Sequence, residues 1–583
     1  MAIAIQQIRP VAHWPLVLGV VRKLNVAALI DTFCPPHPAH ILSCGRGVAV
    51  LLLAMLDGHH ALYKVGARLE ERGMLPLLQE GLGRVSLNDY RLGQILEALF
   101  GANLNRVFGA IALNALDVYA IATPWLHQDT TTLTLYGAYE EEARPVAGLV
   151  PPRPAYGHSK DGRDDLKQVL LSLGVSSDGL PLRMGLRDGN TSDSTETPVA
   201  IEECVALGLD GVHGIVADSK AYCKRTLGLC LEQGVGLITL VPRTCAVRQE
   251  LETWGQQQEA LPLLLEKPGR TRQESPRRWH GTSVVRQVEV EYADGRIAVE
   301  AIRFLVVHSS QLAQQAAVAY TAAQAKEAEC ITEHIRRVEA RWFACATDAE
   351  AAIADYEGRG QGRRGRTPRL WRYHALHYRV EVVSAPAKRT RRGRPPKGEA
   401  PQSEVRYRLS VHTEPLVPAE DAHGWTVLAT TVRPEVCPDA EILQAYQEQH
   451  ITVEPGFRWI KNPAAISPVW LEKPERIAAL AMLTVVGLLV YAVIQRQVRL
   501  YLCEHDRQVP GNKGPTATPT AAVVFALFTP VMLVQCAIDH TTSLQVHGVQ
   551  DYHLLVCDAV GIDHAWYQGV EMGQNSLPRT TPP

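Results

Sequence analysis

The amino-acid sequence predicts an α/β fold: a mixed core of strands and helices, a helical N-terminal domain before it and a mainly β insertion within it. Three observations support this fold class. Residues 13–118 contain apolar stretches of helical length. From residue 125 onward, strand-like runs alternate with helical segments, as is typical of α/β proteins. Residues 282–411 return to strand-like runs, and 583 residues exceed what one hydrophobic core can hold.

The overall composition narrows the possible functions. Net charge is -2, so there is no global basic excess, and any affinity for nucleic acid would come from local basic patches. The 12 cysteines include no C-x-x-C pair, which favours small buried residues in a reducing compartment over zinc sites. The N-terminus lacks a charged segment followed by an apolar run and a cleavage site, so we expect a cytoplasmic protein without a secretion signal.

Helical segments dominate the N-terminal region. Residues 48–56 are apolar, residues 62–72 are mixed and residues 92–108 are amphipathic. Asn88 or Asp89 is a suitable N-cap for the last of these helices. A small helical domain before an α/β core suits DNA binding and simple packing equally well, and the sequence leaves both roles open.

Asp129 lies within the first expected strand of the core. The run from Trp125 to Tyr139 is rich in threonine, leucine and tyrosine, and β-branched and aromatic side chains fit a pleated surface. A carboxylate buried in such a strand is costly unless it is paired or binds a metal ion. Asp129 is therefore the first candidate metal ligand.

A second carboxylate, Asp218, follows a later strand of the same core. Asp178-Gly179 between two strand-like runs is a strong hairpin signal. The expected strands are residues 168–175, 181–186, 212–217 and 236–241, and the expected helices are residues 195–207 and 220–233. This order is the ribonuclease-H-like arrangement, in which the first and fourth strands lie side by side. Asp129 and Asp218 should therefore be neighbours in space.

The chain after this core resembles an insertion that is mainly β with one helical arm. Residues 282–292 and 296–307 alternate as strands do, around a turn at Asp294-Gly295. Residues 311–356 are alanine-rich and predict a long helical stretch. Strand-like runs return at residues 370–383 and 405–411.

Two basic runs lie in the insertion. The second, Lys388 to Lys397, resembles an AT-hook, in which an extended Gly-Arg-Pro segment places arginines in a narrow minor groove. Its candidate DNA ligands are Arg391, Arg392 and Arg394. A solvated loop is the alternative interpretation, and the sequence leaves the two open. The first run contains Arg359, Arg363, Arg364, Arg366, Arg369 and Arg372.

A helical segment from Ala440 to Lys461 carries the third candidate carboxylate, Glu454. Helical spacing places Glu454, Arg458 and Lys461 on one face. Such a face is either a surface ion-pair cluster or a metal ligand flanked by cations that bind phosphate. The spacing alone favours the first interpretation, whereas its position after an α/β core of this order favours the second.

Several fragments, taken in order, resemble bacterial insertion-sequence transposases with an Asp-Asp-Glu (DDE) site, in the branch with a Tyr-Arg-Glu-Lys helix signature. They extend from about Asn88 to Tyr501 and include HQDTTTLTLYGAYEEE, YGHSKDGRDDLKQVLLSLGVSSDGLPL, GNTSD, IVADSKAY, ITLVPRT and EPGFRWIKNPAAISPVWLEKPERIAALAMLTVVGLLVY. The resemblance implies a transposase DDE domain with a ribonuclease-H-like fold and a β insertion before the glutamate.

The same resemblance implies a mechanism. Asp129, Asp218 and Glu454 would be both the catalytic residues and the ligands of two Mg²⁺ ions, which Mn²⁺ is expected to be able to replace. Lys461 matches the signature lysine and would bind a phosphate near the element end. Tyr446 matches the signature tyrosine and would contact DNA.

The implied partner is double-stranded DNA, both the terminal repeats of the element and the target. Arg458 is expected to hold DNA together with the signature residues. Enzymes of this kind generally act on paired ends, so a homodimer in the synaptic complex is implied. The expected location is the bacterial cytoplasm, on the nucleoid when DNA is bound.

Three departures from the signature surround Glu454. Gln449 occupies the position of the signature arginine, and the gap from Tyr446 to Glu454 is one residue longer than in the family pattern. Pro455 follows directly, and proline disfavours helical geometry in the preceding residue. Glu454 would then lie at a kink or at the start of a new helix. Either the site tolerates this change, or the copy is inactive and only binds DNA.

Residues 477–494 form an apolar run that is long enough to cross a membrane. Arg476 and Arg496 border it closely, and the resemblance implies a buried helix after the glutamate. We therefore expect a core helix and no membrane association, with a membrane span as the alternative.

These expectations divide the chain into five segments and indicate a DNA transposase that cleaves and joins element ends. The rivals are an inactive DNA-binding relic and a generic ribonuclease-H-like nuclease. The segments are a helical domain at 1–118, the first part of the core at 119–265, the insertion at 266–435, the final part of the core at 436–505 and a C-terminal segment at 506–583.

Overall fold

The computed structural model describes residues 3–38, 40–58, 61–78, 82–140, 144–208, 212–269, 274–357, 371–386, 403–417, 423–461, 471–538 and 541–567. The chain forms two compact units. The first comprises Met1–Cys245, Ser283–Leu305 and Leu428–Pro583, and the second comprises Ala246–Thr282 and Val306–Val427. The expected DNA ligands Arg391, Arg392 and Arg394, and the arginines at 359–369, lie outside the described residues.

The N-terminal part of the first unit is helical, as predicted, but the helix expected at residues 92–108 is divided between α6 and α7. Asn88 caps α6, because its Oδ1 accepts a hydrogen bond from the backbone N–H of Arg91 at 2.8 Å. Large side chains such as Trp14 and Phe108 fill the interior of this region. Its helices are α1 (Trp14–Lys23), α2 (Val26–Phe33), α3 (Cys44–Leu56), α4 (Leu62–Glu71), α5 (Leu75–Leu78), α6 (Asp89–Gly101) and α7 (Leu104–Val118).

A mixed sheet follows, in which the strand order from one edge is β4-β3-β2-β5-β6-β13. Strand β2 pairs antiparallel with β3 and parallel with β5, and β5 pairs parallel with β6. The first and fourth strands of the core therefore lie side by side, which confirms the predicted ribonuclease-H-like order. The strands are β2 (Trp125–Leu135), β3 (Lys167–Ser176), β4 (Pro181–Asp188), β5 (Gly214–Ala217), β6 (Gly236–Leu240) and β13 (Trp425–Thr430), and the helices between them are α8 (Asp193–Ala206) and α9 (Lys224–Gln233).

The hairpin between β3 and β4 turns at Asp178-Gly179. Gly179 has a φ of 81°, a left-handed conformation that glycine adopts without strain. Leu171 faces Leu186 across the two strands. The hairpin signal in the sequence was therefore correct, and it sets the register of this edge of the sheet.

Helix α14 (Pro474–Glu504) is the central helix of the first unit. It packs against α1, α3, α6, α7, α13, α15 and α16 and against β4. It is long and apolar enough to cross a membrane, but 94% of its most apolar window is buried inside the protein. A helix covered by other elements on all sides offers no face to lipid, so the structure favours the core-helix interpretation.

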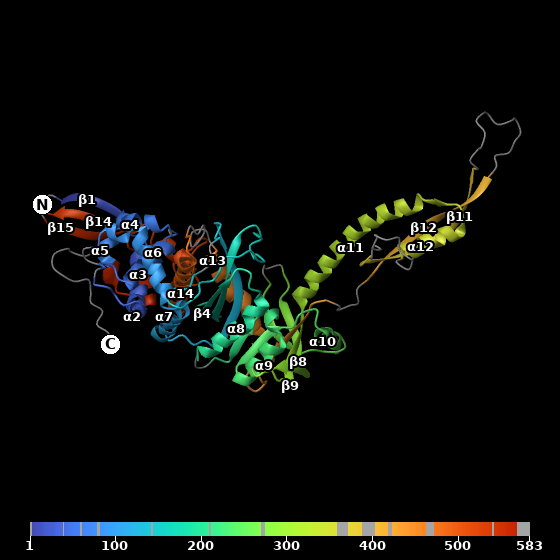
Figure 1. Ribbon diagram of the computed structural model, residues 1–583, viewed down its shortest axis with the longest axis horizontal. Coiled ribbons are helices and arrows are strands. Elements are labelled where there is room, and N and C mark those ends of the chain that lie inside the picture. Colours follow the sequence, from blue (N-terminus) through green and yellow to red (C-terminus); the bar gives the residue numbers. More distant parts are fainter. Residues whose placement is uncertain are drawn as a thin grey trace, which may run out of the picture. The chain divides into compact units, whose positions relative to one another are not determined.

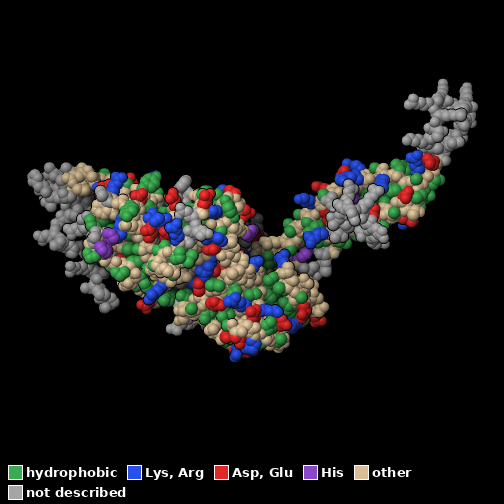
Figure 2. Space-filling view, viewed as in Figure 1, with side chains coloured by type: hydrophobic (Ala, Val, Ile, Leu, Met, Phe, Trp, Pro, Cys, Tyr) green, Lys and Arg blue, Asp and Glu red, His purple; other side chains and the backbone are tan. Residues whose placement is uncertain are grey.

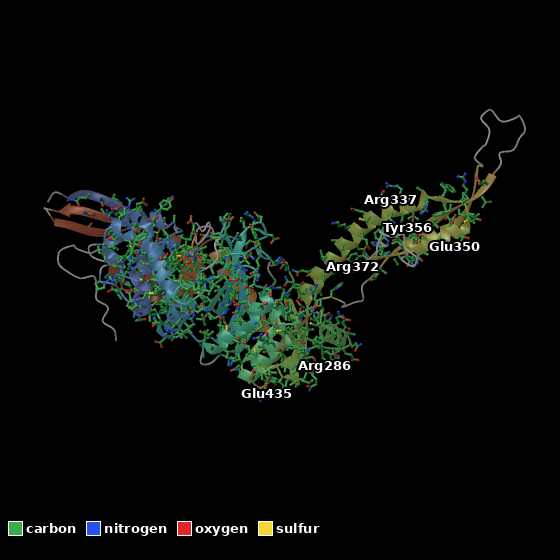
Figure 3. All side chains as sticks on the ribbon, viewed as in Figure 1. Arg286, Arg337, Glu350, Tyr356, Arg372 and Glu435 are labelled. Carbon is green, nitrogen blue, oxygen red and sulfur yellow. The ribbon has the colours of Figure 1, made fainter. Side chains whose placement is uncertain are left out.

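The second unit contains a long helix and a β-ribbon (Figure 1). The single helical stretch expected over residues 311–356 is wrong in one respect: α11 (Ser310–Glu339) and α12 (Ala346–Tyr356) are separated by β10 (Trp342–Phe343). Strand β10 pairs with β12 (Ser403–Pro415), and Phe343 enters a small core with Val338 and Leu409. This tertiary contact overrides the local helical preference. Figure 3 labels Arg337 on α11 and Glu350 and Tyr356 on α12.

Most of the remaining strands of the insertion are long. Strands β11 (His374–Pro386) and β12 form an antiparallel ribbon, and β7 (Leu263–Lys267) pairs with the first residues of β8 (Arg277–Glu291). Strand β9 (Ile297–Ser309) follows the turn at Gly295, and α10 (Ala246–Gln256) precedes β7. Figure 2 shows Lys and Arg side chains interspersed with Asp and Glu over the displayed face, in keeping with a net charge of -2.

A second sheet joins the two ends of the chain and was not predicted. Strand β1 (Ile3–Pro10) pairs antiparallel with β14 (Met532–Ile538), which pairs with β15 (Thr541–His547). Partners so distant in sequence leave no local pattern. The C-terminal helices are α15 (Ala521–Leu527) and α16 (Asp551–Val560).

Candidate active site

The register of the sheet brings Asp129 and Asp218 together. Gln128 of β2 faces Ala217 of β5 in a parallel pair, Asp129 is the next residue of β2, and Asp218 directly follows the end of β5. Neighbouring parallel strands lie about 4.8 Å apart. The backbone of Asp218 is held in turn by Thr239, whose hydroxyl donates to the Asp218 carbonyl oxygen at 2.6 Å. Asp129 and Asp218 therefore occupy neighbouring positions on adjacent strands.

Burial and like charge act on both carboxylates. Burial raises the pKa of Asp129 to about 6, with Asp218 and Asp193 adding to the rise and Lys160 and the backbone N–H of Thr130 opposing it. Burial also raises the pKa of Asp218, and Asp193 again contributes. Asp129 and Asp218 are therefore neighbouring carboxylates with little access to water, Asp193 lies close to both, and a bound cation would reduce their mutual repulsion.

Glu454 reaches the same region from α13 (Asp439–Ile460). This helix runs through Pro455 without interruption, so no new helix begins at Glu454. Asp129 and Glu454 both line an open cavity of about 830 Å³. Its other lining residues are Thr130, Thr131, Lys160, Phe457, Arg458 and Lys461. The expected face of Glu454, Arg458 and Lys461 therefore turns toward Asp129.

The other residues expected in the site do not line this cavity. Asp218 is next to Asp129 but is not among the residues that line the cavity. Tyr446 is half-buried on α13 and also lies outside the cavity lining. Gln449, at the signature-arginine position, is buried, and its side-chain amide donates to the carbonyl oxygen of Gln128 at 3.4 Å. It links α13 to the strand position before Asp129.

Two charged residues of the site escaped the sequence-based selection. Lys160 lines the cavity, and Asp193, the first residue of α8, raises the pKa of both Asp129 and Asp218. Each belongs to a fragment that carried the resemblance, but no spacing rule connects either residue to Asp129. Only the folded sheet brings them together.

The donors present suit a hard divalent cation, because carboxylate oxygens are the ligands that Mg²⁺ prefers. Within the part of the chain that the structure describes, however, no three acidic, histidine or cysteine side chains converge closely enough to hold a metal ion. Asp129 and Asp218 fit as an adjacent pair, and Glu454 lines the same cavity as Asp129.

Comparison with known families gives two matches. Residues 129–490 match the family described as Transposase DDE domain, and residues 6–113 match a Domain of unknown function (DUF4277). No curated protein matches the chain. The first match begins at Asp129, ends within α14 and spans more than half of the 583 residues. The chain therefore belongs to the DDE transposase family, whose members act on DNA as nucleases and strand transferases.

Proposed function

We propose that this transposase cleaves and joins insertion-sequence ends by two-metal phosphoryl transfer, with Asp129, Asp218 and Glu454 as catalytic residues and metal ligands. The placement of the three acids carries the proposal most directly. The parallel pairing of Gln128 with Ala217 makes the first two acids neighbours, and Glu454 shares a cavity with Asp129. The family match supports transposition, and the acids provide the chemistry for it.

The reaction would be an in-line displacement at phosphorus. A water oxygen bonds to the phosphorus while the bond to the 3′-oxygen breaks, leaving a 3′-hydroxyl and a 5′-phosphate. In the joining step the 3′-hydroxyl attacks the target strand in the same way. Bound Mg²⁺ ions, or Mn²⁺ in their place, would activate the attacking oxygen and stabilise the leaving one. The three carboxylates would hold the ions, and the cavity walls would orient the strand.

The cations of α13 are suited to hold that strand. Arg458 is exposed and Lys461 is partly exposed on the cavity wall, where guanidinium and ammonium groups can bind phosphate oxygens. Tyr446 would contact DNA farther along the same helix. The proposal further includes membership of the Tyr-Arg-Glu-Lys branch and minor-groove binding by Arg391, Arg392 and Arg394. It also includes a synaptic homodimer, action in the cytoplasm and the division of the chain into the five segments given above.

An inactive DNA-binding relic is the alternative, and one observation favours it. Among the described residues no three potential ligands converge on one point, so Glu454 does not close a metal site with the two aspartates. The relic would bind DNA and never cut it.

Cleavage of the DNA that borders this gene, with and without Mg²⁺, tests the proposal. The wild type should cut, and Asp129→Ala, Asp218→Ala and Glu454→Ala should bind DNA but lose cleavage. Glu448→Ala is the matched control, since it removes a carboxylate from α13 that does not line the cavity. Binding by the wild type without any cleavage would favour the relic. Cleavage by the three variants at the wild-type rate would rule out the assigned triad.

A further inference from the structure

Lys160 reaches into the cavity of Asp129 and Glu454 from the loop between β2 and β3. Its Nζ donates to the carbonyl oxygen of Thr130 at 2.8 Å and to Thr130 Oγ1 at 2.5 Å. It also lies 3.3 Å from Asp193 Oδ2, and its side chain is 29% exposed. The ammonium group is thus anchored beside the first acid and still reachable from the cavity.

The neighbours of Lys160 hold it in this place. The Thr130 hydroxyl donates to Asp193 Oδ1 at 2.7 Å, which joins β2 to α8 directly under the ammonium group. The backbone N–H of Lys160 donates to Thr132 Oγ1 at 3.1 Å. The buried Ser159 fixes the loop, because its N–H donates to Asp164 and its Oγ accepts from the N–H of Arg163. These hydrogen bonds fix the Lys160 side chain and its loop before any ligand binds.

The hydrogen bonds of the ammonium group leave room for a ligand. A lysine ammonium has three N–H donors. Thr130 accepts two of them, and Asp193 Oδ2 lies 3.3 Å from the same nitrogen as its ion-pair partner. A phosphate oxygen in the cavity would share the third donor with Asp193. Arg458 and Lys461 line the same cavity from α13, so cations stand on two of its walls.

We propose that Lys160 is a further DNA ligand of the active site, which binds a phosphate oxygen of the strand in the cavity while Thr130 and Asp193 fix its ammonium group. The inference rests on the proposed function, because the ligand is the DNA strand to be cut. It adds a contact from the sheet side of the cavity to those expected from α13. A strand held from both sides would be aligned across Asp129 and Glu454.

Salt dependence of DNA binding tests this contact directly. The probe is a duplex of the DNA that borders the gene, titrated in EDTA so that binding is measured without cleavage. Lys160→Ala should lower the slope of log affinity against log salt by about 0.9, which weakens binding about eightfold at 0.1 M salt. Lys160→Arg should keep the slope. Lys224→Ala, which removes an exposed lysine of α9 outside the cavity, should match the wild type.

Two results would overturn the inference. One is a wild-type slope and affinity for Lys160→Ala. The other is an equal loss of affinity at every salt concentration, which would indicate a structural role only. Thermal melting checks folding, and Lys160→Met, which keeps the aliphatic stem, replaces the alanine variant if that variant melts early. Thr130→Val keeps the charge and removes one anchor, so it should weaken binding less than Lys160→Ala.

The same set of proteins separates this inference from the proposed function. Cleavage by Asp129→Ala at the wild-type rate would defeat the proposed triad and leave a Lys160-dependent slope standing. Loss of cleavage in Asp129→Ala together with an unchanged slope in Lys160→Ala would support the proposed triad and overturn the inference about Lys160. A wild type that binds no DNA would overturn both.

Discussion

The Nζ atom of Lys461 lies 2.6 Å from Oδ1 of Asp161, so the loop after β2 and the end of α13 are joined by an ion pair at the rim of the cavity. Both side chains are partly exposed, at 25% and 31%. Lys461 is the residue expected to bind a phosphate of the element end. DNA must therefore compete with Asp161 for this ammonium group.

Asp161→Asn should raise DNA affinity, because it removes the competing charge and keeps the shape of the side chain. A partly exposed ion pair contributes up to about 1 kcal/mol, so the gain should be about two- to fivefold at low salt. Fluorescence anisotropy with an end duplex in EDTA would measure it. Asp165→Asn is the control, since Asp165 pairs with Arg163 outside the cavity lining. Equal affinities for Asp161→Asn and the wild type would mean that the pair does not limit binding.

Acidic pH should weaken both cation binding and cleavage. Burial raises the pKa of Asp129 to about 6, so this carboxyl is increasingly protonated as pH falls through 6. A protonated carboxyl is a poor ligand for Mg²⁺, so Mn²⁺ binding measured by electron paramagnetic resonance should fall between pH 7 and 5. If binding stayed constant over this range, Asp129 would not be a ligand in its ionised form.

The same shift has the opposite effect on stability. The pKa of Asp129 is higher in the folded protein than the ordinary 3.8, so the folded state binds more protons between pH 4 and 6. The free energy of unfolding therefore decreases as pH rises through this window, because Asp129 must lose its proton in a buried place. Asp129→Asn should be more stable than the wild type at pH 7 by up to about 3 kcal/mol, with the difference vanishing near pH 4. Urea unfolding at the two pH values measures it.

The order of the strands was accessible from the sequence because the signals for the single strands and the turn are local. The Asp178-Gly179 turn, the threonine-rich strand around Asp129 and the apolar run before Asp218 each have a pattern of their own, and their order indicates the strand arrangement. Adjacency of the two aspartates then follows from topology. The catalytic roles of these residues stay predictions.

The remaining features depend on contacts between distant segments. Strand β1 pairs with β14 across almost the whole chain, and the break at Trp342 exists because β10 joins β12. The ion pair of Lys160 with Asp193 depends on how a loop and the start of α8 meet over β2. Helical or strand periodicity carries no information about such pairs. Helix α13 also continues through Pro455, although proline alone favours a break at this position.

The buried ion pair between Arg183 of β4 and Glu196 of α8 should contribute strongly to the free energy of unfolding. Arg183 and Glu196 are paired at 3.0 Å with side chains 3% and 1% exposed. Arg183 also donates to Ser172 Oγ at 2.5 Å. Glu196 also pairs with Arg187 at 2.7 Å. Arg183→Ala would therefore remove one of the two cationic partners of a buried carboxylate, and we expect a loss of about 2–3 kcal/mol. Arg153→Ala, whose exposed side chain lies 3.9 Å from Asp188, should cost less than about 1 kcal/mol in the same denaturant titration. Similar costs for both would contradict the burial argument.

Pro455 should destabilise α13 without disabling it. The helix continues from Asp439 to Ile460 although proline lacks the N–H that the preceding turn would use. Pro455→Ala restores this donor, so the melting temperature should rise, by the equivalent of about 1–3 kcal/mol. Pro474→Ala is the control: Pro474 is the first residue of α14, where proline is tolerated, and its replacement should change stability little. Because Glu454 already faces the cavity beside Pro455, cleavage by Pro455→Ala should stay within about threefold of the wild type, whereas a large gain in cleavage would show that the proline holds Glu454 away from the aspartates.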